Sequence, residues 1–265
     1  MAWVSVQRDT RGVAVITIDN AARLNTLNTP VMTELIAVVE RLGADETLRA
    51  AVLRGAGERA FIGGADIDEM AGLDPVSARA FITLVHRSCD VFRRMPVPVI
   101  ARIKGYVFGA GVEVAAACDM RVAGTDAQFG MPEVRLGVPS VVEAALLPQL
   151  IGWGRTRQWL LTGDTINAAT AHAWGLVEEI APPEQLDAAV ERLLESILVS
   201  GPRAVRLQKT LITAWEDLPL RDAMQRGIDS FAAAWEGEEP RRMMQDFLDR
   251  RRERKLAEGR TEKPE

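Results

Sequence analysis

The sequence predicts an α/β fold with a core of parallel strands, followed by a helical region. Segments with strand and helix patterns alternate through the first half of the chain, and such alternation is typical of parallel sheets. From Ser140 the pattern becomes mainly helical. With 265 residues, 48% of them hydrophobic, the chain can bury one domain core and carry a helical appendage. We therefore expect a core over residues 1–200 and a helical region over 201–265.

The first elements are predicted to be a hairpin, a helix and a buried strand. Apolar and polar residues alternate in Val4 to Gln7 and in Val13 to Ile18, which predicts two strands joined by a glycine turn. Thr29-Pro30 begins a helix, since apolar residues follow helical spacing from Val31 to Leu42. The apolar run from Ala50 to Leu53 indicates the next strand.

A second unit repeats this order. A long helix is predicted from about Val76 to Phe92, and after a break at Pro96 to Pro98 a strand runs from about Val99 to Ile103. Further short strands are indicated near Met120 to Ala123 and near Glu178 to Ile180. Strands that alternate with helices in this way are expected to run parallel.

The last section begins at Gly201-Pro202 and is predicted to be helical. Its helices carry wide apolar stripes on segments too short to form a core alone. The stripes include Leu207, Leu211, Trp215, Phe231, Trp235 and Phe247. They are expected to pack on the core, on another subunit or on both, so self-association is a hypothesis. The tail from Glu258 is expected to be disordered.

Composition narrows the range of partners. The formal net charge is -5 and the charges are interspersed, so no face is expected to bind nucleic acid or an anionic membrane. Cys89 and Cys118 lack the spacing of a disulfide framework or a thiolate metal site. No apolar stretch reaches membrane-spanning length. Small metabolites are the expected ligands, and the cytoplasm is the expected compartment.

Two segments combine a glycine turn with the start of a helix. One runs from Ala60 to Met70 around Gly63-Gly64, and the other runs from Gly105 to Glu113. The first N–H groups of a helix lack internal partners and lie at the positive end of its dipole. Two such turns side by side would give one oxygen two amide donors. The glycine spacing of the second turn does not match the dinucleotide fingerprint, which disfavours nicotinamide binding.

Two glutamates are the candidates for acid–base chemistry. Glu113 lies early in an apolar helix, and Glu133 lies in a loop that contains Gly130 and Pro132. Each alone is compatible with an ordinary structural carboxylate. Together they can titrate as a coupled pair and hold a water between a base and an acid.

Other titratable residues have structural interpretations. Ser140 and Glu143 match the capping box, in which the two side chains satisfy helix-end amides; the alternative is a third active-site carboxylate. His86 and His172 lie in helical, partly apolar contexts without the patterns of a catalytic triad or a metal site. Both histidines are expected to be structural or exposed, and no metal site is predicted.

These motifs together resemble the crotonase superfamily, also called the enoyl-CoA hydratase/isomerase family, from about Trp3 to Lys255. Asn20 to Leu27 looks like the family's early substrate segment, and Leu161 to Asp164 and Trp174 to Val177 look like its later landmarks. The resemblance implies a spiral of repeated ββα units, followed by C-terminal helices used to form a homotrimer, often stacked into a hexamer as a dimer of trimers. It also implies an acyl-CoA thioester as substrate and a place in fatty acid β-oxidation.

The resemblance further implies roles for individual residues. The amides of Ala65 and Ala110 are implied to form the oxyanion hole, and Gly64, Asp66, Ile67 and Gly109 to line the thioester site. Arg23 and Asn25 are implied to lie near coenzyme A. Glu113 and Glu133 match the two glutamates of a hydratase. Two departures stand out. Ala110 replaces the commoner glycine, and the segment from Gly137 to Ala144 replaces a glycine-rich stretch. The second departure leaves acyl specificity open.

The implied activity is hydration of a 2-enoyl-CoA without metal, flavin or nicotinamide. Glu113 is assigned as the base that orients water and Glu133 as the proton donor to the α-carbon. The alternatives are isomerisation of a 3-enoyl to a 2-enoyl thioester, in which Glu143 would assist, or thioester hydrolysis or retro-aldol cleavage. A catalytically silent acyl-CoA-binding subunit is a further alternative.

Overall fold

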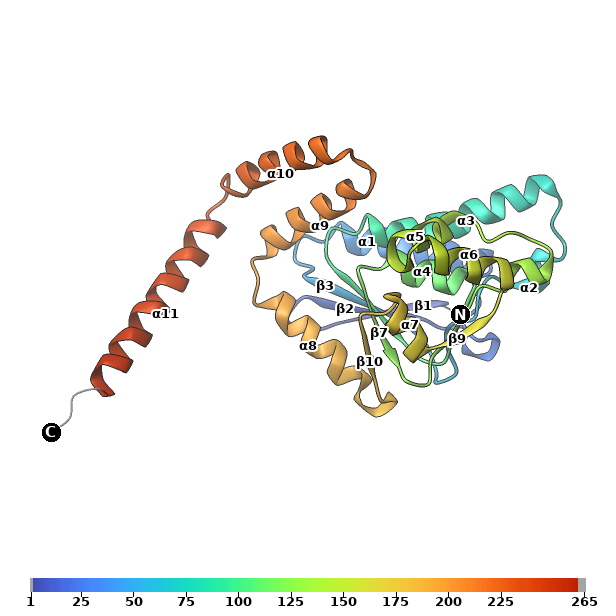
Figure 1. Cartoon of the computed structure of the whole chain (residues 1–265), viewed down its shortest axis with the longest axis horizontal. Helices are drawn as coiled ribbons and strands as arrows, with labels where there is room; N and C mark the ends of the chain where they lie inside the picture. The colour runs from blue at the N-terminus through green and yellow to red at the C-terminus, as the bar shows by residue number, and fades with distance from the viewer. Residues whose placement is uncertain (1, 262–265) are drawn as a thin grey trace. The chain divides into compact units, whose positions relative to one another are not determined.

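The computed structural model describes residues 2–261, with side chains to residue 254. It divides into two compact units after Leu198. The first unit contains two sheets (Figure 1). The larger sheet has the order β1-β2-β3-β5-β7-β10; β1 pairs antiparallel with β2, and the other neighbours pair parallel. Its strands are β1 (Val4–Arg8), β2 (Val13–Ile18), β3 (Ala50–Gly55), β5 (Val99–Ile103), β7 (Met120–Gly124) and β10 (Glu179–Ala181).

The smaller sheet was not predicted from the sequence. Its order is β4-β6-β8-β9, and its strands are β4 (Ala60–Ile62), β6 (Tyr106–Phe108), β8 (Gln128–Gly130) and β9 (Thr165–Asn167). Each has three residues, which is too short to show a period of two. The pairs β3–β4, β5–β6 and β7–β8 each contribute one strand to each sheet. With the helices that follow them, they form repeated ββα units, as the family resemblance implies.

The helices of the first unit lie on both faces of the larger sheet (Figure 1). The α-helices are α1 (Thr29–Gly43), α2 (Ile67–Met70), α3 (Pro75–Arg93), α4 (Ala110–Ala117), α5 (Leu147–Ile151), α6 (Trp153–Thr162), α7 (Ala168–Trp174) and α8 (Leu186–Leu198). The 3₁₀ helices are η1 (Ala21–Arg23), η2 (Glu133–Leu136), η3 (Val142–Leu146) and η4 (Pro183–Gln185). The hairpin of β1 and β2 and the long helix α3 confirm the sequence predictions.

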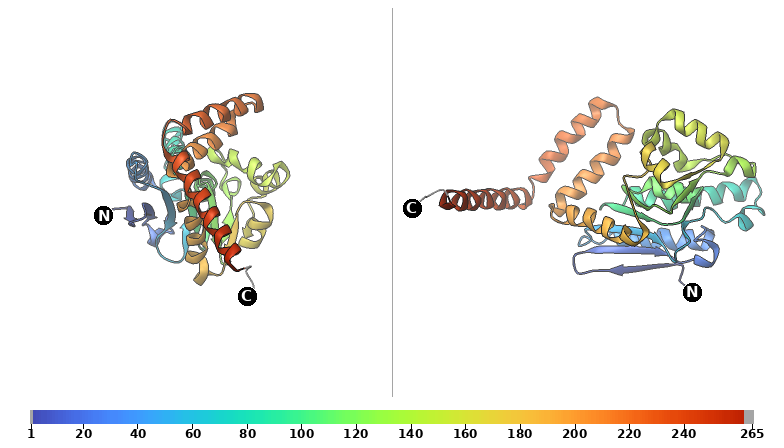
Figure 2. Two further views of the ribbon diagram at one scale, coloured as in Figure 1. Left: turned by 90° about the vertical axis from the view of Figure 1, so that its left-hand side faces the viewer. Right: turned by 60° about the horizontal axis from the view of Figure 1, so that its bottom comes forward.

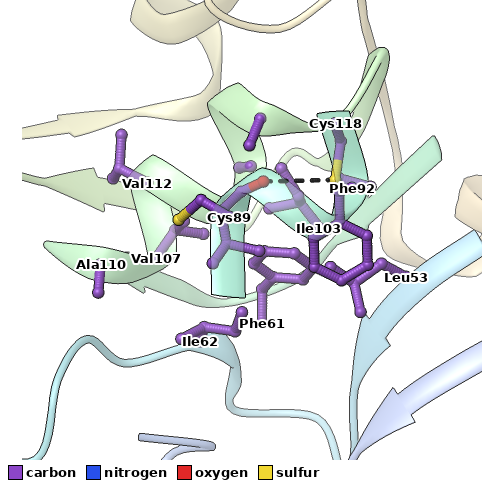
Figure 3. Packing of buried hydrophobic residues seen from close by; sticks show 14 of the residues in the cluster. Leu53, Phe61, Ile62, Cys89, Phe92, Ile103, Val107, Ala110, Val112 and Cys118 are labelled. Carbon is purple, nitrogen blue, oxygen red and sulfur yellow. Dashed lines mark hydrogen bonds between the residues drawn. The ribbon is translucent and has the colours of Figure 1, made fainter. Parts of the chain in front are cut away.

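The core explains the apolar run predicted as a buried strand. Ala51 and Leu53 of β3 pack into the cluster with α1, α3 and α4, whereas Ala50 and Val52 pack into the cluster with α8. Figure 3 shows Leu53 in the first cluster, beside Phe92 of α3. Because successive residues of a strand point to opposite faces, a strand covered on both sides must be apolar throughout.

The second unit consists of three helices, α9 (Pro202–Asp217), α10 (Leu220–Ala234) and α11 (Glu239–Thr261). α9 and α10 pack against each other as a hairpin (Figure 2), and Trp215 Nε1 donates to the Ala223 carbonyl at 3.1 Å. α11 continues to Thr261, so residues 258–261 are helical, which differs from the disordered tail expected from Glu258. The rest of that tail, 262–265, lies outside the described residues.

Candidate active site

The two predicted glycine turns lie side by side. β4 and β6 are parallel neighbours, and each ends in a glycine turn that leads to a helix. Carboxyl ends of parallel strands meet at one edge of a sheet, so Gly63-Gly64-Ala65 and Gly109-Ala110 come together there. A Cβ on Gly111 would lie 2.2 Å from the Ile62 carbonyl oxygen, which shows how closely the two backbones approach.

Both turns present an unused amide. Leu27 and Ala65 form an isolated parallel β-bridge, in which Leu27 N donates to Gly64 O at 2.8 Å and Asp66 N donates to Leu27 O at 3.0 Å. The N–H of Ala65 takes part in neither hydrogen bond. Ala110 is the first residue of α4, where N–H groups have no intrahelical acceptor. Among the described residues, neither N–H has a hydrogen-bond partner. Two N–H groups on adjacent turns are the donor set of an oxyanion hole.

The glycine requirement falls on Gly64 and Gly109 rather than on Ala110. Gly64 has φ +109° and Gly109 has φ +51°, whereas Ala110 is absent from the residues with positive φ. The alanine at position 110 therefore keeps its amide without backbone strain. A Cβ on Gly109 would lie 2.5 Å from Glu133 Oε1, so this glycine makes room for the glutamate.

A cavity of about 590 Å³ joins the two turns to both glutamates. Of the predicted residues, Gly64, Ala65, Ile67, Gly109, Ala110, Glu113 and Glu133 line it. Most of the remaining wall is apolar and includes Met70, Phe81, Ile82, Val85 and Val141. These wall residues come from α2, α3 and the loop after η2, and no sequence motif singled them out. A cavity with an apolar wall and a few polar groups is typical of small-molecule sites.

Glu113 is held inside the otherwise apolar helix α4. Its side chain is buried, and Oε1 accepts a hydrogen bond from Ala144 N at 3.2 Å. The pKa of Glu113 is raised to about 8, mainly by burial and also by the nearby charge of Glu133, while the Ala144 hydrogen bond opposes the rise. The ligand-free site therefore keeps a proton on this carboxyl group at neutral pH.

Glu133 begins the 3₁₀ helix η2 instead of lying in an irregular loop, which corrects the sequence-based description. Its carboxylate oxygen Oε2 accepts a hydrogen bond from the Ser140 hydroxyl at 2.8 Å. Burial raises the pKa of Glu133, and the hydrogen bonds from its own backbone and from Ser140 oppose the rise. The two glutamates thus form a coupled pair with unequal environments.

The capping-box prediction for Ser140 and Glu143 is wrong. The cap residue of η3 is Val141, which makes no side-chain cap, and Ser140 donates to Glu133. Glu143 Oε1 instead lies 2.7 Å from Nδ1 of His86, a residue expected to be structural or exposed. The two positions are 57 residues apart. A local motif cannot anticipate that contact, because it depends on how η3 packs against α3.

Three predicted residues do not line the cavity. Asn25 is fully buried; its Nδ2 donates to Ala56 O at 3.0 Å and Ala60 O at 2.9 Å. Arg23 forms ion pairs with Asp66 at 2.8 Å and Asp68 at 2.7 Å. Asp66 is buried and caps α2 by accepting a hydrogen bond from Glu69 N at 3.1 Å. All three contacts fix the backbone on either side of Ala65.

The described part of the chain lacks two features, a cluster of metal-binding side chains and a membrane-spanning helix. No group of three or more His, Cys, Asp or Glu side chains that could hold a metal ion occurs among those residues. None of the helices described there is long and apolar enough to cross a membrane.

Nearly the whole chain is similar to several known proteins. The family model for enoyl-CoA hydratase/isomerase matches residues 8–255. The short-chain-enoyl-CoA hydratase of Clostridium acetobutylicum is 33% identical over 91% of this chain and 92% of its own length. The crotonyl-CoA hydratase of Syntrophomonas wolfei is 34% identical over 91% and 93%. The crystal structure of the Bacillus anthracis enoyl-CoA hydratase superposes with a TM-score of 0.90 at 30% identity, covering 94% of this chain and 96% of that one.

Proposed function

The chain belongs to the enoyl-CoA hydratase/isomerase family, and we propose from that premise that it adds water across the 2,3 double bond of a 2-enoyl-CoA thioester. The observation that carries the proposal is the coupled pair Glu113 and Glu133 on the same cavity as the two free amides. Hydration needs both sets of groups. The amides bind the carbonyl oxygen of the thioester. One carboxyl group of the pair takes a proton from the attacking water, and the other gives a proton to the α-carbon.

In this mechanism the N–H groups of Ala65 and Ala110 bind the carbonyl oxygen, on which negative charge develops as water attacks the β-carbon. Each such donor is typically worth about 2.7–4 kcal/mol in the transition state. The α-carbon then takes a proton from the carboxyl group that carries one. The reaction calls for no metal, flavin or nicotinamide, because amides and carboxyl groups supply all of these steps.

The proton must be placed correctly within the pair. Burial keeps it on Glu113 in the ligand-free chain, whereas the roles assigned from the sequence require Glu133 to donate it. With Glu113 as base, the proton must therefore reach Glu133 before the attack, and a water between the two carboxyl groups provides that path. In the reverse assignment, Glu133 is the base and no transfer is needed.

We also propose that the C-terminal helices assemble the chain into a homotrimer, or a hexamer as a dimer of trimers. A groove of about 680 Å³ lies among α9, α10 and α11, and Ile228, Phe231, Met244 and Phe247 are exposed on these helices. Light scattering is expected to give three or six times the 29.0 kDa chain mass. A monomer mass would refute this proposal. The cytoplasm remains the proposed compartment.

The function is tested by following the loss of enoyl-thioester absorbance with 2-enoyl-CoAs of several chain lengths. Glu113→Gln and Glu133→Gln are each expected to lower kcat by about 10²–10⁴, the usual contribution of a positioned acid or base. Glu178→Gln is the matched control, because this glutamate pairs with buried Arg121 and does not line the cavity. No hydration at any chain length would refute the proposal.

The same assay separates the alternatives. Conversion of a 3-enoyl to a 2-enoyl thioester without incorporation of solvent oxygen would identify an isomerase. Release of free coenzyme A or of a shortened acyl product would identify a hydrolase or a lyase. Ligand binding without turnover would identify a silent acyl-CoA-binding subunit.

A further inference from the structure

A buried carboxyl group outside the cavity is tied to the protein surface. Glu143 is 3% exposed, and its Oε1 lies 2.7 Å from Nδ1 of His86 on α3. The imidazole side chain is 47% exposed. Glu143 does not line the cavity, so it is not placed to touch a substrate. Some other role must explain why a carboxyl group is buried there.

The residue that follows Glu143 contacts the catalytic pair. Ala144 N donates to Glu113 Oε1 at 3.2 Å, so one peptide step separates the His86 contact from the Glu113 contact. Both contacts are made by η3, which packs against α3 and α4. The position of this short segment therefore decides whether the Glu113 carboxyl group receives its backbone hydrogen bond.

The backbone next to Glu143 is strained. Val142 has φ +39°, a left-handed conformation that a β-branched side chain rarely adopts. Such a conformation persists where surrounding contacts hold it in place. The contact of Glu143 with His86 is the side-chain anchor immediately after the strained residue. Losing the anchor is expected to let η3 relax and withdraw Ala144 N from Glu113.

We propose that His86 and Glu143 are positioning residues that hold the Ala144 N–H on the carboxyl group of Glu113. The inference rests on the proposed function for its kinetic consequence, but the geometry can be tested without turnover. Other charged or titratable groups also face this pair. Cys89 and Arg93 of α3 lower the pKa of Glu143, and Glu133 of η2 raises the pKa of Glu113.

The first test is a carboxyl-carbon NMR titration of Glu113 in the wild type and in His86→Ala. Losing the Ala144 hydrogen bond raises the pKa of Glu113, while protonation of an unpaired Glu143 lowers it; the hydrogen bond is the larger of the two effects. A higher Glu113 pKa in His86→Ala is therefore expected. An unchanged or lower pKa would overturn the inference, whatever reaction the protein catalyses.

The second test is kinetic. Glu143→Ala and His86→Ala are each expected to lower kcat for a 2-enoyl-CoA about tenfold, which corresponds to the loss of one ordinary hydrogen bond, with KM within about twofold. Glu143→Gln keeps an acceptor for the imidazole and is expected to restore kcat to within about threefold of wild type. A kcat of Glu143→Gln near the wild-type value would show that the position of the side chain matters and its charge does not.

Glu178→Ala controls for general destabilisation, since it removes the partner of buried Arg121 at a distance from the cavity. It is expected to lower Tm without changing kcat. If His86→Ala and Glu143→Ala lower only Tm, as this control does, the inference is overturned while the hydratase proposal stands. If the wild type hydrates no 2-enoyl-CoA, the hydratase proposal fails and the NMR titration alone decides the inference.

Discussion

Gly109→Ala tests whether the site depends on the placement of Glu133. A Cβ at this position would lie 2.5 Å from Glu133 Oε1, and ordinary contacts begin at 3.4 Å, so the carboxyl group must retreat by about 0.9 Å. A misplacement of about 1 Å can cost about 10²-fold in rate. The backbone, at φ +51° and ψ -119°, also disfavours alanine, which is expected to cost about 1–3 kcal/mol of stability.

Gly152→Ala is the matched control. Gly152 has φ +79° and ψ +154°, a conformation that also disfavours alanine, but a Cβ there would meet nothing within 4 Å. Thermal unfolding and hydration of a 2-enoyl-CoA are measured for both variants. Both are expected to lose stability, and only Gly109→Ala is expected to lose about 10²-fold in kcat. Equal kcat values in the two variants would refute the steric reasoning.

Three further predictions concern the surroundings of the pair. Ser140→Ala removes the hydroxyl that donates to Glu133, so the Glu133 pKa is expected to rise and kcat/KM at neutral pH to change about tenfold; a pH profile identical to wild type would contradict this. Folding raises the Glu113 pKa from 4.5 to about 8, so between these pH values the folded chain keeps a proton that the unfolded chain releases. The free energy of unfolding therefore falls as pH rises through this range, by on the order of 5 kcal/mol. Glu113→Gln is therefore expected to have a higher Tm than wild type at pH 8 and a similar Tm at pH 5; a lower Tm at pH 8 would count against the burial argument. Asn25→Ala leaves two carbonyl groups without their donor and is expected to cost about 3 kcal/mol, measured by urea unfolding, with KM unchanged; a raised KM would instead favour the coenzyme A contact.

The sequence predicted those parts of the fold whose signal is local and repeated. The alternation in Val4 to Gln7 and in Val13 to Ile18 predicted two strands, and the helical spacing from Val31 to Leu42 predicted a helix; the structure has all three elements. Burial of one face accounts for the helical spacing, whereas β2 is buried along nearly its whole length and only Val4 of β1 is buried. The smaller sheet escaped prediction because strands of three residues have no readable period. Its importance is nevertheless large, since the pairing of β4 with β6 brings the two glycine turns together.

The candidate site was predicted in its central residues and missed in its supports. Glycine turns that enter helices carry a local signal for free amides, so the two turns could be proposed from the chain alone, and the family resemblance then singled out Ala65 and Ala110 within them. The contacts of Ser140 with Glu133 and of Glu143 with His86 carry no such signal. They depend on tertiary packing of a segment whose local pattern favoured a capping box.

That segment links the two glutamates of the proposed catalytic pair. Between positions 140 and 144, one hydroxyl donates to Glu133, one backbone amide donates to Glu113, and one carboxyl group binds His86 on the outside of α3. Both hydrogen bonds oppose the effect of burial on the glutamates, so a shift of this segment would raise both pKa values together. Higher pKa values favour the protonated form of each carboxyl group, and a carboxyl group that keeps its proton cannot act as the base. The segment that replaces the glycine-rich stretch therefore acts on the protonation of both glutamates at once, through one hydrogen bond to each.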